Sequence, residues 1–219
     1  LLGQPPPVGC VLARTMVCRD RCVQARTLRT HPRKAVCQPT TMAAVLGGDE
    51  DAVLARFAEL DLIPANRNAA GQIVAAGSVA AIDALIADPP ERARTRKLAV
   101  AGAFHTPFMA PAQEAVAHAA AKITPADPTR TLLSNSDGQP VTNGADALTK
   151  LVGQVTKPVR WDLCSAYMRA QATDRIVELP PAGTLVGIAK RELKGTPTVA
   201  LKTPDDLEPI DPTRLADLN

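Results

Sequence analysis

Residues 41–100 alternate between short apolar runs and stretches in which apolar residues recur every three or four positions. The runs TMAAVLGG, QIVAAG and TRKLAVAG are typical of buried strands, and LIPANRNAAG indicates an extended, turn-rich passage. Helices are predicted over residues 50–60, after the N-cap Asp49, and over residues 79–87, after the N-cap Ser78. The order strand, helix, strand, strand, helix, strand predicts a ferredoxin-like unit.

Beyond residue 100 the same two patterns continue. The predicted helices cover residues 108–123, 145–155, 161–170 and 184–193. The predicted strands cover residues 131–135, 175–179 and 196–202. Because helices alternate with short apolar strands, we expect a mostly parallel sheet, and the predicted fold class is α/β.

Residues 1–40 follow neither pattern. They hold seven Lys or Arg residues against one acid, a net charge of +6, whereas the whole 219-residue chain carries +3. They also hold four of the five cysteines and a run of three prolines. Such a segment can be a basic tail that binds a partner, a disordered region, or a stretch foreign to the fold that arose by truncation or a reading-frame error. We favour the last interpretation.

Composition excludes several classes of function. No apolar run is long enough for a membrane span and no secretory signal pattern is present, so we expect no membrane association and a cytoplasmic protein. Basic residues after residue 40 are spread among acids without interleaved aromatics, so we expect no nucleic-acid surface. Cys18 and Cys22 have no second pair, and His31 and Cys37 do not make one, so we expect no metal site.

His105 is the strongest candidate for chemistry among the three histidines. It lies in VAGAFHTPFMAPA, after a predicted strand and before a predicted helix, where α/β proteins place functional loops. Histidine titrates near neutral pH and is the usual general base, but a histidine that only satisfies a nearby backbone carbonyl fits this position equally well. His118 lies inside an Ala-rich helix and is better explained as a helix residue.

A general base needs a nucleophile, and no acyl-transfer elbow of the form G-x-S-x-G occurs in the sequence. Ser78 lies in AGSVA and is explained by helix capping. Cys164 lies within a predicted helix with no activating cation beside it, so a small buried thiol is the better explanation. No nucleophile is therefore found.

Two further stretches carry polar residues at the ends of predicted elements. Asn66 and Gln72 lie in NRNAAGQIVAAG, a turn-prone passage that can line a cleft, although an ordinary hairpin explains the spacing better. Gln154, in LVGQVTKPVRW, ends a predicted helix.

Taken together with ELPPAGTLVGIAKREL and ALKTPDD, these stretches resemble the malonyl-CoA:acyl carrier protein transacylases in order and spacing, over about residues 41–207. The stand-alone actinobacterial type is the most similar. The resemblance implies a partial α/β-hydrolase-like large subdomain with an inserted ferredoxin-like small subdomain. It divides the chain into the non-matching residues 1–40, a small subdomain of residues 41–100, and the C-terminal part of the large subdomain, residues 101–219.

The resemblance also implies an activity. Members of this family serve fatty-acid biosynthesis by moving a malonyl group from coenzyme A to the thiol of acyl carrier protein through an acyl-serine. His105 would accept the serine proton, and the backbone carbonyl of Gln154 would orient it. Asn66 and Gln72 match positions near the acyl-CoA cleft, and Phe104 resembles the malonyl-selective pattern. Malonyl-CoA and acyl carrier protein are the expected partners; coenzyme A enters as substrate, and no cofactor is implied.

The departures from the family concern the nucleophile. Residues 1–40 contain no Gly-Gln-Gly loop, no Gly-His-Ser-x-Gly-Glu elbow and no arginine placed to bind the malonyl carboxylate. Pro180-Pro181-Ala182 stands where the family has Gly-Pro-Gly. We therefore expect the chain to be inactive alone. The alternatives are a non-catalytic module that binds acyl carrier protein and an acyltransferase domain of a polyketide synthase.

Overall fold

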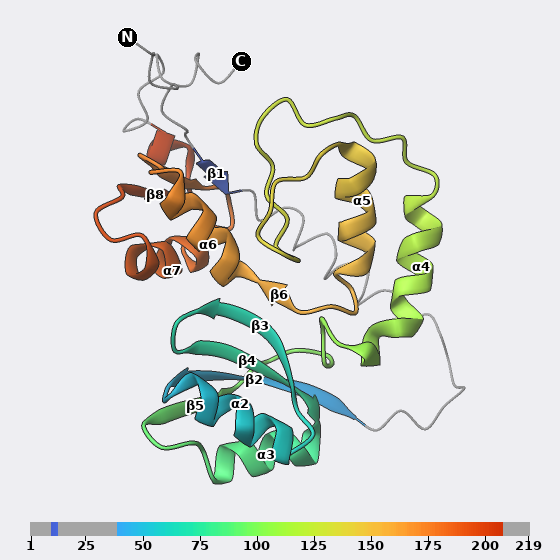
Figure 1. The fold of residues 1–219 in the computed structure, drawn as a ribbon, viewed down its shortest axis with the longest axis vertical. Coiled ribbons are helices and arrows are strands. Elements are labelled where there is room, and N and C mark those ends of the chain that lie inside the picture. Colours follow the sequence, from blue (N-terminus) through green and yellow to red (C-terminus); the bar gives the residue numbers. More distant parts are fainter. Residues whose placement is uncertain (1–9, 13–38, 208–219) are drawn as a thin grey trace. The chain divides into compact units, whose positions relative to one another are not determined.

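A computed structural model describes residues 10–12 and 39–207 of the chain (Figure 1). The chain divides into two compact units, one of residues 20–166 and the other of residues 1–19 together with 167–219. The expectations for residues 1–40, including the four residues weighed as metal ligands, lie outside the described residues except at positions 10–12 and 39–40. The boundaries predicted at residues 40/41 and 100/101 stay predictions.

The larger unit is built on a five-stranded sheet with the order β5-β2-β4-β3-β6. In that order the strands are Ala93–Lys97, Thr40–Gly47, Gln72–Ser78, Ile63–Ala69 and Val159–Arg160. The first four strands are antiparallel to their neighbours, and β6 joins β3 in parallel. With α2 Glu50–Glu59 and α3 Val79–Ala87 between strands, the predicted order of elements is confirmed. The passage after Leu62 is a strand whose pairing with β4 has two register shifts.

Both helices of this sheet begin where their caps predict. The Asp49 carboxylate accepts a hydrogen bond from the Ala52 N–H at 3.1 Å, and the Ser78 hydroxyl accepts one from the Ala81 N–H at 3.1 Å. Each cap satisfies an N–H group that has no partner inside the helix, which fixes the residue at which the helix starts. Ser78 is therefore a capping residue, as predicted.

Alternation along the strands gives the sheet two buried faces. Val45 and Ile73 face a core shared with α2 and α3, which Figure 1 shows together on one side of the sheet. Met42 and Val74 lie three positions and one position away on the same strands, and they face a second core that contains Phe104. Because side chains point to opposite faces at successive positions, the same two strands position both the helices and the loop that holds the candidate histidine.

The remaining elements of this unit are helical. They are the 3₁₀ turn Pro107–Met109, α4 Ala110–Ala120, α5 Gly144–Gly153 and the start of α6 Trp161–Ala170. Figure 1 shows α4 and α5 packed side by side. None of the described helices is long and apolar enough to cross a membrane.

One expectation about the strands beyond residue 100 is confirmed, and another was wrong. Ile176–Glu178 pairs in parallel with Thr198–Ala200, and β6 joins β3 in parallel, whereas the ferredoxin-like strands β2 to β5 pair antiparallel. Residues 131–135 form no strand: only Leu133 pairs, with Pro140, across a turn that contains Gly138. Gly138 has a φ of +70°, and a Cβ there would collide with Leu163, so the chain reverses tightly instead of extending.

The smaller unit has a parallel sheet in the order β1-β7-β8, which are Cys10–Leu12, Ile176–Glu178 and Thr198–Ala200. The helix α7 Thr184–Glu192 follows β7. Its N-terminus binds the carboxylate of Glu178, which is fully buried and accepts hydrogen bonds from the N–H groups of Gly183, Leu185 and Val186 at 2.8–3.0 Å. These N–H groups have no intrahelical acceptor, and a buried carboxylate needs such donors.

We predict that Glu178→Gln lowers the free energy of unfolding by about 2–3 kcal/mol, because an amide replaces one accepting oxygen with a donor that faces N–H groups. Urea denaturation followed by circular dichroism measures the change. Glu192→Gln is the matched control, since its carboxylate has only a 3.5 Å ion pair with Arg169. An equal effect of both substitutions would contradict this role for Glu178.

Candidate functional site

His105 lies in a tight loop between β5 of the five-stranded sheet and the 3₁₀ turn that precedes α4. The Ala103 N–H donates to the Thr40 hydroxyl at the start of β2, at 3.1 Å, and the Thr106 hydroxyl donates to the Ala103 carbonyl at 2.6 Å. Thr106 is fully buried, so this second bond is shielded from water. His105 itself has a φ of +60°, a left-handed conformation that persists where its surroundings over-determine it.

The His105 imidazole is buried, and its Nδ1 lies 2.8 Å from the backbone carbonyl oxygen of Gln154. A carbonyl oxygen can only accept a hydrogen bond, so Nδ1 is the nitrogen that carries the proton in this pair. In the neutral ring, Nε2 then has the lone pair and is the nitrogen able to take up a proton. The geometry therefore suits a general base oriented by a backbone carbonyl.

Gln154 is the C-cap of α5, and its side chain is as constrained as its carbonyl. The side-chain Nε2 donates to the carbonyls of Lys157 and Pro158, at 2.9 and 2.7 Å. Directly after this turn, β6 pairs with β3, and Val159 lies opposite Asn66. The turn that presents the carbonyl is thus attached to the edge of the sheet.

The three expected substrate-binding residues lie in different surroundings. Phe104 is only 6% exposed and packs with Met42 and Val74 on the sheet face. Asn66 is partly buried in β3, opposite Val74 of the neighbouring strand. Gln72 is at the start of β4, beside the hairpin turn. Phe104 is adjacent to His105 in the chain, whereas Asn66 and Gln72 lie on β3 and β4 of the sheet.

The hydroxyls and thiol considered as nucleophiles have other surroundings. The Ser78 hydroxyl caps α3, and the Cys164 thiol is buried and donates to the Ser134 carbonyl at 3.5 Å. The Ser165 hydroxyl is buried on α6, without a hydrogen-bond partner among the described residues. In the described part of the chain, no three His, Cys, Asp or Glu side chains are grouped to hold a metal ion.

Sequence reasoning missed the residues that hold the loop. Thr40 and Thr106 are ordinary strand and loop threonines in the sequence, and Gln113 looks like an exposed helix residue. Their side chains bond to backbone groups far along the chain or across the loop. The only local signal is the position of Thr106, directly after His105.

The turn before α5 is held by charge. Asp137 forms an ion pair with Lys150 of α5 at 3.0 Å, and accepts a hydrogen bond from the Gln139 N–H at 3.1 Å. Burial raises the pKa of Asp137, but these two donors outweigh it and hold the pKa below its ordinary value. The hydrogen bond from Lys150 to Asp137 in turn raises the pKa of Lys150.

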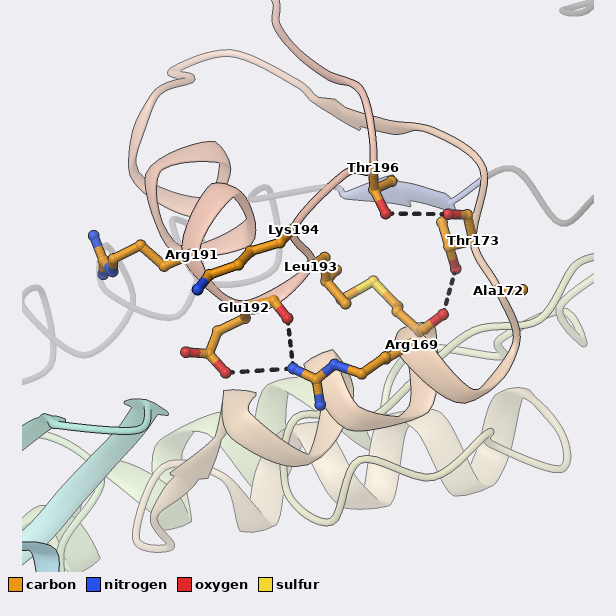
Figure 2. Close-up of a pocket in the computed structure, with 9 residues that line it drawn as sticks. Arg169, Ala172, Thr173, Arg191, Glu192, Leu193, Lys194 and Thr196 are labelled. Carbon is orange, nitrogen blue, oxygen red and sulfur yellow. Dashed lines mark hydrogen bonds and ion pairs between the residues drawn. The ribbon is translucent and has the colours of Figure 1, made fainter.

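A separate hollow of about 390 Å³ lies in the smaller unit, between the C-terminal ends of α6 and α7 (Figure 2). Arg169 crosses it and donates to the backbone carbonyl of Glu192 at 2.5 Å. The Thr173 and Thr196 hydroxyls donate to the carbonyls of Met168 and Thr173. These polar side chains bind backbone carbonyls of neighbouring segments, so their presence in the hollow has a structural explanation.

The comparisons with curated proteins and with solved structures point to the same family. No protein-family model matches the chain. The malonyl CoA-acyl carrier protein transacylase of Mycolicibacterium smegmatis is 66% identical over 178 residues, which are 80% of this chain and 61% of that protein. The transacylase of Mycobacterium tuberculosis H37Rv is 57% identical over 200 residues, covering 91% of this chain and 66% of the relative. This second match extends into the first forty residues.

Among solved structures, the crystal structure of MCAT from Mycobacterium tuberculosis matches with a TM-score of 0.80 and 57% identity. The match covers 89% of this chain and 62% of that one. The chain therefore spans about three fifths to two thirds of the length of these relatives. Their structures share its α/β fold.

We predict that Asp137→Asn lowers the free energy of unfolding at neutral pH by less than about 1 kcal/mol, since both side chains of the pair are partly exposed to solvent, which screens the charges. Because the pKa of Asp137 is lowered in the folded state, its contribution is present above the unfolded Asp pKa of about 3.9 and is lost as the pH falls. Urea unfolding of both proteins across this range should show the gap closing in acid. A gap that persists unchanged at low pH would contradict the charge argument.

Proposed function

Because the chain belongs to the malonyl-CoA:acyl carrier protein transacylase family, we propose that it forms the histidine-bearing part of an acyltransferase. The names of its relatives give malonyl CoA, acyl carrier protein and transacylase. The proposed reaction therefore moves a malonyl group from coenzyme A to the thiol of acyl carrier protein. The observation that carries the proposal is the buried 2.8 Å hydrogen bond between His105 Nδ1 and the Gln154 carbonyl.

The bond supports a base-assisted acyl transfer. With its proton held on Nδ1, His105 takes the proton of a serine hydroxyl on Nε2 while the serine oxygen attacks the thioester carbonyl. The proton then passes to the sulfur of the departing coenzyme A. In the second half of the reaction, the carrier-protein thiol gives its proton to His105, attacks the acyl-serine and restores the serine hydroxyl.

Gln154 replaces the acidic residue of a Ser-His-Asp triad with a neutral acceptor. Its carbonyl is at the C-terminus of the ten-residue helix α5, where the last carbonyls lack intrahelical donors. The helix macrodipole places partial negative charge there, which stabilises a nearby imidazolium by about 0.3–1 kcal/mol, and more where the site is partly buried. The carbonyl therefore supplies both orientation and some of the charge.

The proposed substrate contacts follow from the neighbourhood of His105. Phe104 packs beside it on the sheet, and Asn66 lies at the strand that β6 joins. We propose that Phe104, Asn66 and Gln72 border the acyl-CoA cleft. Coenzyme A takes part as substrate, and the proposed steps require no cofactor or metal.

The 219 residues contain no G-x-S-x-G elbow. We therefore predict that the chain alone gives no covalent malonyl adduct when it is incubated with malonyl-CoA and examined by intact-protein mass spectrometry. Circular dichroism shows in the same sample that the protein is folded. An adduct that maps to Ser78, Ser165 or Cys164 would reveal a nucleophile other than an elbow serine.

The role of His105 can be tested in a fusion that supplies the N-terminal part of a relative. We expect activity when residues 41–219 are joined behind the N-terminal part of the Mycolicibacterium smegmatis transacylase, measured as malonyl transfer from malonyl-CoA to acyl carrier protein. His105→Ala should lower the transfer rate by about 10³-fold or more. His118→Ala is the matched control and should leave the rate unchanged. Equal rates for His105→Ala and the parent would refute the proposed base.

A further inference from the structure

The Gln154 side chain is buried and hydrogen-bonded, although it stands at the end of a helix. Gln154 is only 4% exposed, and its amide nitrogen donates to two successive carbonyls, those of Lys157 and Pro158. Its Oε1 is buried without a hydrogen-bond partner among the described residues. Leaving an acceptor unsatisfied in this way costs free energy, so the two bonds from Nε2 determine where the side chain lies.

A second glutamine holds the same turn from the other side. Gln113 Nε2 donates to the Val152 carbonyl at 3.4 Å, and the Thr156 hydroxyl donates to Gln113 Oε1 at 3.2 Å. Gln113 belongs to α4, the helix that follows the His105 loop. The helix α4, which begins close to His105, therefore also binds the turn that contains the Gln154 carbonyl.

These contacts connect the two ends of the His105–Gln154 hydrogen bond by a second route through α4. From His105 the chain runs through α4 to Gln113, from there by hydrogen bonds to residues 152 and 156, and from Gln154 back to the His105 Nδ1. A helix C-terminus on its own frays, because its last carbonyls have no donors within the helix. Here the Gln113 and Gln154 side chains form hydrogen bonds to residues on both sides of position 154, which limits this fraying.

We propose that the side-chain amides of Gln113 and Gln154 are positioning groups that hold the Gln154 carbonyl against Nδ1 and so keep the neutral His105 ring in the Nδ1–H tautomer. This inference rests on the proposed role of His105 as a base, because only that tautomer leaves Nε2 able to accept a proton. Neither glutamine touches the reacting atoms through its side chain; each acts through the carbonyl.

The test is the tautomer of His105 in the full chain, which needs no turnover. Nitrogen-15 spectra of the imidazole, recorded above the ordinary histidine pKa of about 6.5, distinguish Nδ1–H from Nε2–H. The His105→Gln spectrum identifies the signals. In the parent chain we expect Nδ1–H to dominate. Gln154→Met, of similar length but without an amide, should lower the ratio of Nδ1–H to Nε2–H by about fivefold, the effect of one typical hydrogen bond.

Gln113→Leu should lower the same ratio less, since it acts one step further from the carbonyl, and it keeps the test open if Gln154→Met does not fold. The double variant should lower the ratio by less than the product of the two single effects, because both side chains act on the same carbonyl.

The matched control is Asn143→Ala, which removes the N-cap of the same helix at its opposite end. It should cost stability in urea unfolding without changing the tautomer ratio. The proposal is overturned if neither glutamine substitution changes the ratio, or if Asn143→Ala changes it equally. A preserved tautomer in a completed enzyme that transfers no malonyl group would instead count against the proposed function alone.

Discussion

The hydrogen bond between His105 and the Gln154 carbonyl is the constraint on which the rest of the site depends. It joins residues 49 positions apart, and each end is held by further bonds within its own segment. Thr40 and Thr106 fix the loop before and after Ala103, while the Gln154 side chain fixes the turn after α5. A shift of either segment by a fraction of an ångström weakens the bond, because hydrogen bonds are steep in distance and angle.

The sheet face that packs against this loop combines large and small residues. Ala65 and Ala76 of the sheet and Ala103 of the loop are fully buried and belong to the same core as Met42 and Val74. Aromatic residues are only 2% of the chain, and Phe104 is the one that fills this interface. The loop is therefore positioned by this shared core, with Phe104 as its one large aromatic side chain, and by the hydrogen bond from Ala103 to Thr40.

Local patterns predicted the ferredoxin-like elements well, because each has its own signal: Asp49 and Ser78 cap helices, and apolar runs mark the strands. The strand expected at residues 131–135 failed for a physical reason. An apolar run pairs only where a partner strand is available, and here Gly138 turns the chain back after a single bridge.

The pairing of His105 with Gln154 came from family resemblance, since composition and spacing left His105 equally explained by a structural role. The supporting residues had no such signal. Gln113 is unremarkable in sequence, because its partners at positions 152 and 156 are brought near only by the packing of α4 against α5. A supporting residue such as Gln113 is identified only from its contacts in the structure. A candidate base such as His105 can be identified in the sequence, because its residue type suits the chemistry.

The orientation of the base is encoded within one part of the chain. The described bonds that set it, from Thr40 to Ala103, from Gln113 to Val152 and from Gln154 to Pro158, all lie between residues 40 and 158, inside the larger compact unit. The smaller unit has its own organising group in the buried Glu178 carboxylate, at the N-terminus of α7. The two sets of bonds share no residue. Loss of the contacts to the Glu178 carboxylate should therefore disturb the smaller unit, and loss of those to the Gln154 carbonyl the larger unit, without directly breaking hydrogen bonds in the other.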